Sequence, residues 1–129
     1  MPTVRRRLVL HERAVARGHC DLLPQGAVAA LARAQIARDI VMARAIAPYI
    51  ENGVVLLAGN GHVRKDIGVP IWLTPRQRAT ATSIGLIERD GAPPIEVLEE
   101  QFDAAVLTDT AERPDPCAPL RQRLSPAGP

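Results

Sequence analysis

A histidine in a glycine-rich turn is the first candidate for chemistry in this sequence. His62 belongs to the run AGNGHV, residues 58–63, which follows an apolar run at residues 54–58. Gly59 and Gly61 permit positive φ angles and the close approach of a ligand to the backbone. An imidazole there can serve as a metal or haem-iron ligand, as a general base or as a hydrogen-bond donor. The alternative is a tight turn whose histidine is hydrogen-bonded to the backbone.

A polar patch on a long predicted helix is the second candidate. On a helical wheel, residues 24–47 place Gln35, Arg38 and Asp39 in the middle of a face that is apolar at both ends. Buried Arg and Asp side chains are costly unless they have partners. The patch therefore indicates a ligand pocket, unless these residues form a structural tie between helix and sheet or a solvated face.

The two cysteines restrict the metal chemistry. Cys20 and Cys117 are far apart and no C-x-x-C occurs, which excludes a zinc ribbon and a covalently attached haem. His19 precedes Cys20, but neighbours in sequence do not thereby acquire the geometry of a nucleophile and its base. We therefore interpret this pair as structural.

The elements that would position these residues alternate between helix and strand. We predict helices at residues 4–17, 24–47 and 95–101, and strands at residues 54–58, 80–88 and 102–108. Residues 68–73 are predicted to be extended and residues 74–78 to form a loop. The run 54–58 has no polar residue, so it is expected to be a central strand covered on both faces. This order predicts an α/β fold with a mainly parallel sheet and flanking helices.

Length and composition bound the remaining possibilities. The chain has 129 residues and a net charge of +2, which suits one partial domain over residues 1–111 and a Pro-rich tail over residues 112–129. Only one Trp, one Tyr and one Phe occur, so base stacking by a nucleic-acid reader is a poor fit. No apolar run approaches the ~20 residues of a transmembrane helix or forms a signal-peptide core. The chain as written is therefore expected in the cytoplasm.

Six strings occur in a distinctive order along the chain: GHCDLLP (18–24), AQIARDIVMA (34–43), AGNGHVRKDIGVP (58–70), SIGLIE (83–88), FDAAVLTD (102–109) and ERPDPCA (112–118). Together they resemble the ChaN-like haem-binding uptake family, in the superfamily of erythromycin esterases and Tiki-type metalloproteases. The resemblance implies an α/β fold with a central sheet and a bacterial role in iron or haem acquisition at the cell envelope or in the periplasm.

The resemblance also implies a set of site residues. The family's RD pair falls on Arg38 and Asp39, and its GNGH turn falls on Asn60, Gly61 and His62. The esterase branch carries a similar helix and a similar strand-turn-His, so both elements are expected to face one pocket at one end of the sheet.

One family motif has no counterpart before Gly18. Family members carry a G-E-x-H motif on an early strand, whereas here His11 and Glu12 lie in a predicted helix in the reverse order. The chain thus resembles the C-terminal half of a ChaN-like domain. It is expected to be a truncated gene product, a mis-called start or one half of a split protein, and to form a homodimer or pair with the missing half.

The first functional hypothesis is a non-catalytic haem-binding protein of iron uptake. His62, Met42 and Tyr49 are its candidate iron ligands, and Arg38 and Arg64 are candidate partners of the haem propionates. No nucleic acid and no membrane span are expected to take part.

The second hypothesis is a hydrolase of the same superfamily. Asp39 and His62 would act on water, with or without a divalent metal. A third is a fragment without independent function, because three short strands and two long helices make a thin core.

Both cysteines fall inside family strings. We therefore expect Cys20 and Cys117 to lie close enough to form a disulfide in an exported relative, the alternative being two reduced thiols in the cytoplasm.

Overall fold

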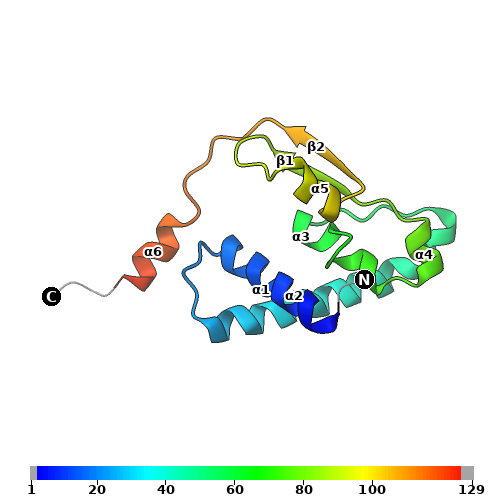
Figure 1. Ribbon diagram of the computed structural model, residues 1–129, viewed down its shortest axis with the longest axis horizontal. Coiled ribbons are helices and arrows are strands. Elements are labelled where there is room, and N and C mark those ends of the chain that lie inside the picture. The colour runs from blue at the N-terminus through cyan, green and yellow to red at the C-terminus, as the bar shows by residue number, and fades with distance from the viewer. Residues whose placement is uncertain (1–2, 126–129) are drawn as a thin grey trace.

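Two long antiparallel helices form one side of the structure, a computed structural model in which residues 3–125 are described (Figure 1). Helix α1 (Val4–Gly18) begins after Thr3, whose side-chain oxygen accepts a hydrogen bond from the backbone N–H of Arg6 at 3.3 Å. Helix α2 (Gln25–Ile46) follows Pro24. Both helices lie within about one residue of their predicted bounds.

The rest of the chain consists of short elements. In chain order they are η1 (Ala47–Asn52), α3 (Asn60–Val63), η2 (Val69–Trp72), α4 (Pro75–Ala79), β1 (Ile84–Glu88), α5 (Ile95–Gln101), β2 (Ala104–Thr108) and α6 (Ala118–Leu124).

Strands β1 and β2 form a parallel two-stranded sheet joined through α5. Their register pairs Ile84 with Ala104 and Leu86 with Val106. Gly85 of β1 lies against the ring of Phe102, where an added Cβ would approach the ring to 2.9 Å. The fold is therefore a partial α/β fold with helices flanking a small parallel sheet, as predicted.

The predicted strand at residues 54–58 is wrong as a central strand. These residues are extended but belong to no sheet, and the side chains of Val55 and Leu57 are 84% and 90% exposed. Apolar β-branched residues favour a buried strand only where a neighbouring layer covers them. No described element covers the outward side of this segment.

Two further predictions of local structure are wrong. Residues 68–73 are not extended but contain the 3-10 helix η2, and residues 74–78 are not a loop but contain α4. Thr74 and Gln77 form a reciprocal capping box, and Pro75 occupies the first turn, where its missing N–H costs nothing. The polar residues and the proline that favour a loop here are the start signal of a helix.

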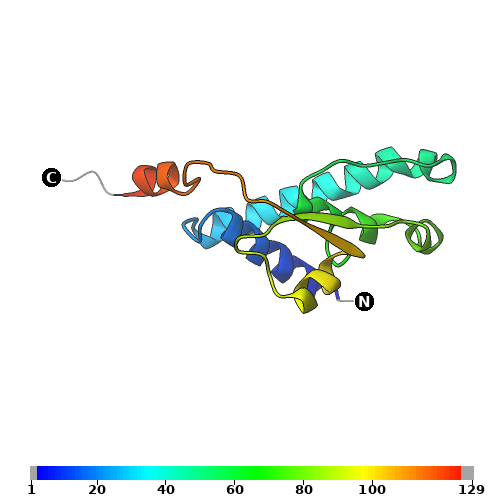
Figure 2. The same ribbon diagram turned by 90° about the horizontal axis from the view of Figure 1, so that it is seen from above.

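The Pro-rich C-terminal stretch also contains a helix. Helix α6 accommodates Pro119 in its first turn for the same reason, and it projects away from the other elements (Figures 1 and 2). A disulfide joins Cys117, before α6, to Cys20, after α1, with 5.9 Å between the two Cα atoms.

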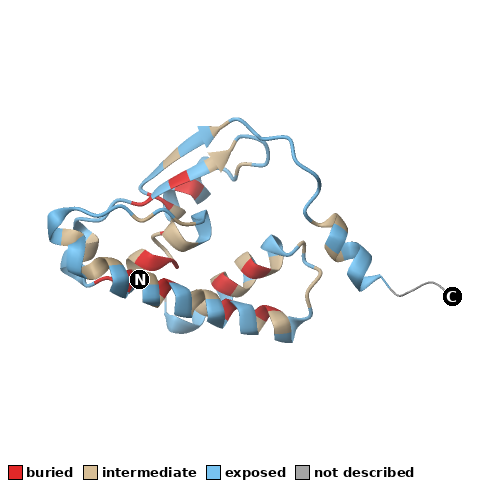
Figure 3. Cartoon of the chain, turned by 180° about the vertical axis from the view of Figure 1, so that it is seen from behind, coloured by how far each residue is buried: buried red, intermediate tan, exposed pale blue. Residues whose placement is uncertain are grey.

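Two clusters of buried apolar residues lie along α2, and Leu98 and Phe102 are buried beside the sheet. Figure 3 shows how the buried residues are distributed over the chain. One cluster contains Val15, Val28 and Ala32, between α1 and α2. The other contains Ala43, Val69 and Leu73, between α2 and η2. No helix within residues 3–125 is long and apolar enough to cross a membrane.

Candidate functional site

Asp39 occupies an unusual place in the fold. It lies on the buried face of α2, between Ala32 of one apolar cluster and Ala43 of the other, and only 1% of its surface is exposed. The helical spacing that buries both alanines therefore also carries this carboxyl group into the interior. Burial raises the pKa of Asp39 above its ordinary value, although His62 opposes that shift.

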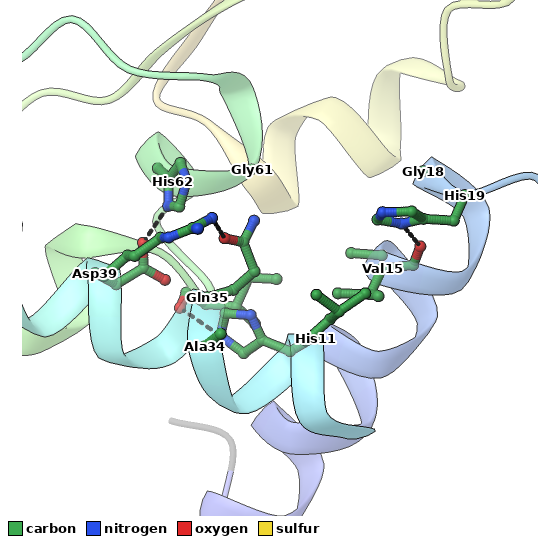
Figure 4. Close-up of a pocket in the computed structure, with 13 residues that line it drawn as sticks. His11, Val15, Gly18, His19, Ala34, Gln35, Asp39, Gly61 and His62 are labelled. Atoms are coloured by element: carbon green, nitrogen blue, oxygen red, sulfur yellow. Dashed lines mark hydrogen bonds and ion pairs between the residues drawn. The ribbon is translucent and has the colours of Figure 1, made fainter. Parts of the chain in front are cut away.

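His62 is the hydrogen-bond partner of this carboxyl group. Its Nδ1 lies 2.6 Å from Oδ1 of Asp39, and the histidine side chain is 20% exposed (Figure 4). With the carboxylate ionised and the imidazole neutral, Nδ1–H donates and Nε2 keeps its lone pair. The second carboxyl oxygen, Oδ2, is buried and has no hydrogen-bond partner. The pair thus combines an oriented imidazole with a carboxylate that has one unsatisfied oxygen.

The backbone around His62 is held from several directions. His62 belongs to the single-turn helix α3 rather than to the predicted glycine-rich turn after a strand. The side-chain hydroxyl of Ser83, before β1, donates to the carbonyl of Val63, and the backbone N–H of Lys65 donates to the carbonyl of Gln101 at 2.8 Å. A Cβ added to Gly68 would lie 2.2 Å from the carbonyl oxygen of His62, so only glycine permits this close approach.

A cavity of about 270 Å³ lies beside the Asp39–His62 pair. It is enclosed mainly by α1, α2 and α3 rather than by strand ends. Its lining residues are His11, Ala14, Val15, Gly18, His19, Leu31, Ala34, Gln35, Arg38, Asp39, Gly61, His62 and Ile67 (Figure 4). Leu31, Ala34 and Arg38 are exposed, whereas His11 and Asp39 are buried.

Two further histidines line this cavity, each with one ring nitrogen bound to a carbonyl. Nε2 of His11 lies 3.0 Å from the oxygen of Ile67, and Nδ1 of His19 lies 2.8 Å from the oxygen of Val15. A carbonyl only accepts, so these nitrogens carry the hydrogen and the other nitrogen of each neutral ring is left as an acceptor. Burial lowers the pKa of His11, which favours its neutral form.

The structure brings together at the cavity five of the residues that the sequence singled out. Arg38, Asp39 and His62 meet at the cavity, and Gln35 accepts a hydrogen bond from Arg38 at 3.2 Å. Gly61 also lines it. Arg38 does not pair with Asp39, because consecutive helical residues point in different directions.

Other candidates lie away from the cavity. Asn60 binds both backbone groups of Leu86, donating to the oxygen at 2.7 Å and accepting from the N–H at 3.1 Å. Arg64 forms a bidentate pair with Asp66, at 2.9 and 2.6 Å. Of the other candidate ligands, Met42 packs in the second apolar cluster and Tyr49 is 59% exposed on η1.

His11 was not among the residues that the sequence singled out for the site, and His19, interpreted as structural beside Cys20, also lines the cavity. His11 follows Leu8 by three residues and precedes Val15 by four, so helical spacing places it on the apolar face of α1. A histidine on that face was a detectable signal. Nothing in the sequence indicates that α1 would bring it beside α2 and the loop at Ile67.

Comparison with known families bears directly on this site. The model of the family described as haem-binding uptake, Tiki superfamily, ChaN matches residues 6–73, just over half of the 129-residue chain. The chain belongs to the ChaN family. The matched range includes every residue that lines the cavity and excludes the three strings after residue 73. No curated protein and no solved structure matches the chain.

Proposed function

We propose that this ChaN-family chain binds haem, with His62 as the iron ligand. The observation that carries the proposal is the 2.6 Å bond between His62 Nδ1 and Asp39 Oδ1. A carboxylate bonded to the far nitrogen of a histidine fixes its tautomer, orients the ring and makes the ligating nitrogen more basic. Nε2 is then the atom offered to a metal centre.

Some of the remaining cavity residues suit a planar anionic ligand, whereas the volume of the cavity is small for one. Arg38 lies exposed beside the cavity and offers a guanidinium to a propionate, whereas Arg64 is already engaged by Asp66. Leu31, Ala34 and Val15 supply apolar walls. A volume of about 270 Å³ is below the 300–1,000 Å³ range of drug-sized pockets, so part of a macrocycle would lie outside it. When bound, haem would supply the iron centre, and the role proposed for the protein is storage or transfer without turnover.

Haem titration of four matched chains tests the proposal. The wild type is expected to give a saturable Soret shift, and His62→Gln is expected to weaken it at least about tenfold while keeping a donor toward Asp39. Tyr49→Phe and Met42→Leu replace the alternative ligands and are expected to bind like the wild type. No saturable shift, or equal binding by His62→Gln, would overturn the proposal; circular dichroism checks that each variant is folded.

A hydrolase is the second candidate, because an Asp–His pair is also the arrangement of a general base and its orienting group. No Ser, Thr or Cys side chain is among the described residues that line the cavity, so the pair would have to act on water. Ester or peptide turnover with added divalent metal that falls in His62→Gln would favour this function over haem storage.

A further inference from the structure

The segment at residues 54–58 has the properties of an unpaired sheet edge. It is extended, and within the described residues no hydrogen bond joins its backbone to any other group. Leu56 packs inward against the cluster of Ala43, Val69 and Leu73, while Val55 and Leu57 point outward. This alternation with a period of two is that of a β-strand whose outer face and edge have no partner.

The segment also lacks the features that normally protect an edge. Natural sheet edges carry lysine, proline, inward-pointing charges or bulges that prevent pairing with another chain. Residues 54–58 read VVLLA and are flanked by Gly53 and Gly59, with no charge and no proline. Exposed apolar strands of this kind pair with further strands through main-chain hydrogen bonds.

The total surface of the chain is large for its mass, and part of it belongs to the projecting helix α6 (Figure 1). The structure exposes 9148 Å². A folded monomer of 13.9 kDa is expected to expose about 6,700 Å², roughly 2,500 Å² less. Obligate homodimers bury about 2,000–5,000 Å² in total, so the excess of each chain is enough to supply such an interface.

We propose that a second copy of this chain pairs with residues 54–58 across a two-fold axis. In antiparallel pairing centred on Leu56, Val55 lies opposite Leu57 of the partner subunit. By symmetry, Leu57 lies opposite Val55 of the partner subunit, and both pairs are on the exposed face. Because the segment is uncharged, the two-fold axis brings no like charges together.

The free edge of strand β2 suits self-pairing less well. Strand β2 is flanked by Asp103 and Asp109, and a two-fold axis centred on Val106 would set Asp103 opposite Asp109 of the partner subunit. Like charges directly opposite each other disfavour strand pairing. This difference favours the 54–58 edge over that of β2, and on β1 both backbone groups of Leu86 are already bonded by Asn60.

Sedimentation equilibrium of the whole chain tests the interface. The wild type is expected to have twice the 13.9 kDa mass of one chain. Val55→Lys is expected to weaken the dimer at least about tenfold, because it buries an unpaired charge at the pairing edge. Val4→Lys is the matched control, since Val4 on α1 is 83% exposed against 84% for Val55, and it is expected to leave the dimer unchanged.

Each remaining outcome counts against the proposal. A wild type that stays monomeric up to hundreds of micromolar overturns it. A dimer that Val55→Lys leaves intact uses another surface and overturns it equally. Leu57→Lys, with the same expected effect, guards against a folding defect peculiar to one variant, and matching far-UV circular dichroism spectra establish that both chains remain folded.

Discussion

Replacing Asp39 by Asn is expected to stabilise this protein while weakening its proposed function. Asp39 is 1% exposed, and among the described residues its side chain has one hydrogen bond, which Oδ1 accepts from His62. Asparagine keeps the shape and an acceptor for His62 but removes the buried charge. It also makes the imidazole less basic, which is expected to reduce affinity for haem.

The magnitude follows from two opposing contributions. A hydrogen bond to a charged group contributes about 1.5–3 kcal/mol, whereas burying an ion costs several kcal/mol when its lone pairs are incompletely satisfied. The unpartnered Oδ2 places Asp39 in the second situation. We expect Asp39→Asn to raise the free energy of unfolding at pH 7 by about 1 kcal/mol, which moves a urea midpoint by roughly 0.5 M for a slope near 2 kcal/mol per molar.

The pH dependence of this difference has a definite sign. Because the folded pKa of Asp39 lies above 3.8, the folded state holds the proton more tightly than the unfolded state. The wild type therefore loses stability relative to Asp39→Asn as pH rises through the folded pKa, and the difference vanishes below 3.8.

Asp66→Asn is the matched control with the opposite expected sign. Asp66 forms a bidentate pair with Arg64, whose side chain is 10% exposed, so the amide would leave a buried guanidinium poorly paired. Urea unfolding at one fixed protein concentration compares both variants with the wild type. If Asp39→Asn lowers the free energy of unfolding at pH 7 as Asp66→Asn does, the reasoning about the buried carboxylate is refuted.

Three further predictions concern residues that support the cavity and the surrounding fold. His11 has a folded pKa below 6.5, so its contribution to stability is complete above pH 6.5 and is lost as pH falls from 6.5 through the folded pKa. His11→Asn should flatten urea stability between pH 5 and 7, and an unchanged slope would refute this. Cys117→Ser opens a loop with a sequence separation of 97. Under oxidising conditions it should cost about 4–5 kcal/mol in the chain-entropy model, measured by urea unfolding with thiols counted by mass spectrometry. Free thiols in the oxidised wild type would contradict it. Gly68→Ala should cost more than about 2 kcal/mol in thermal or urea unfolding because its Cβ would overlap backbone. Gly26→Ala, in open space on α2, should be neutral or stabilising by up to about 1 kcal/mol. If the two substitutions change the free energy of unfolding equally, the close contact of Gly68 with the backbone of His62 is contradicted.

Much of the local structure could be predicted because it depends on short-range signals. Thr3 and Gly18 mark the ends of α1, and α5 and β2 follow their apolar patterns to within two residues. The meeting of Asp39 with His62 was expected from the positions of the motifs, although the enclosing elements are helices rather than strand ends.

The failures have a common physical cause. Residues 54–58 have the composition of a buried strand. That composition makes strand pairing favourable, but it does not determine whether neighbouring strands are present to pair with. The capping box at Thr74 and the first-turn prolines of α4 and α6 show that a polar stretch with proline can start a helix as well as form a loop. His11 reached the cavity through the tertiary packing of α1, which one helix's pattern does not specify.

The most direct test of the central claim, that His62 is the iron ligand, is chemical rescue of His62→Gly by free imidazole. The wild-type haem complex is expected to show a histidine-ligated absorption and resonance Raman spectrum. His62→Gly should lose it and recover it when imidazole occupies the vacated space beside Asp39, while His19→Gly should keep it without addition. A His62→Gly chain that retains the histidine-ligated spectrum in the absence of imidazole would contradict the assignment.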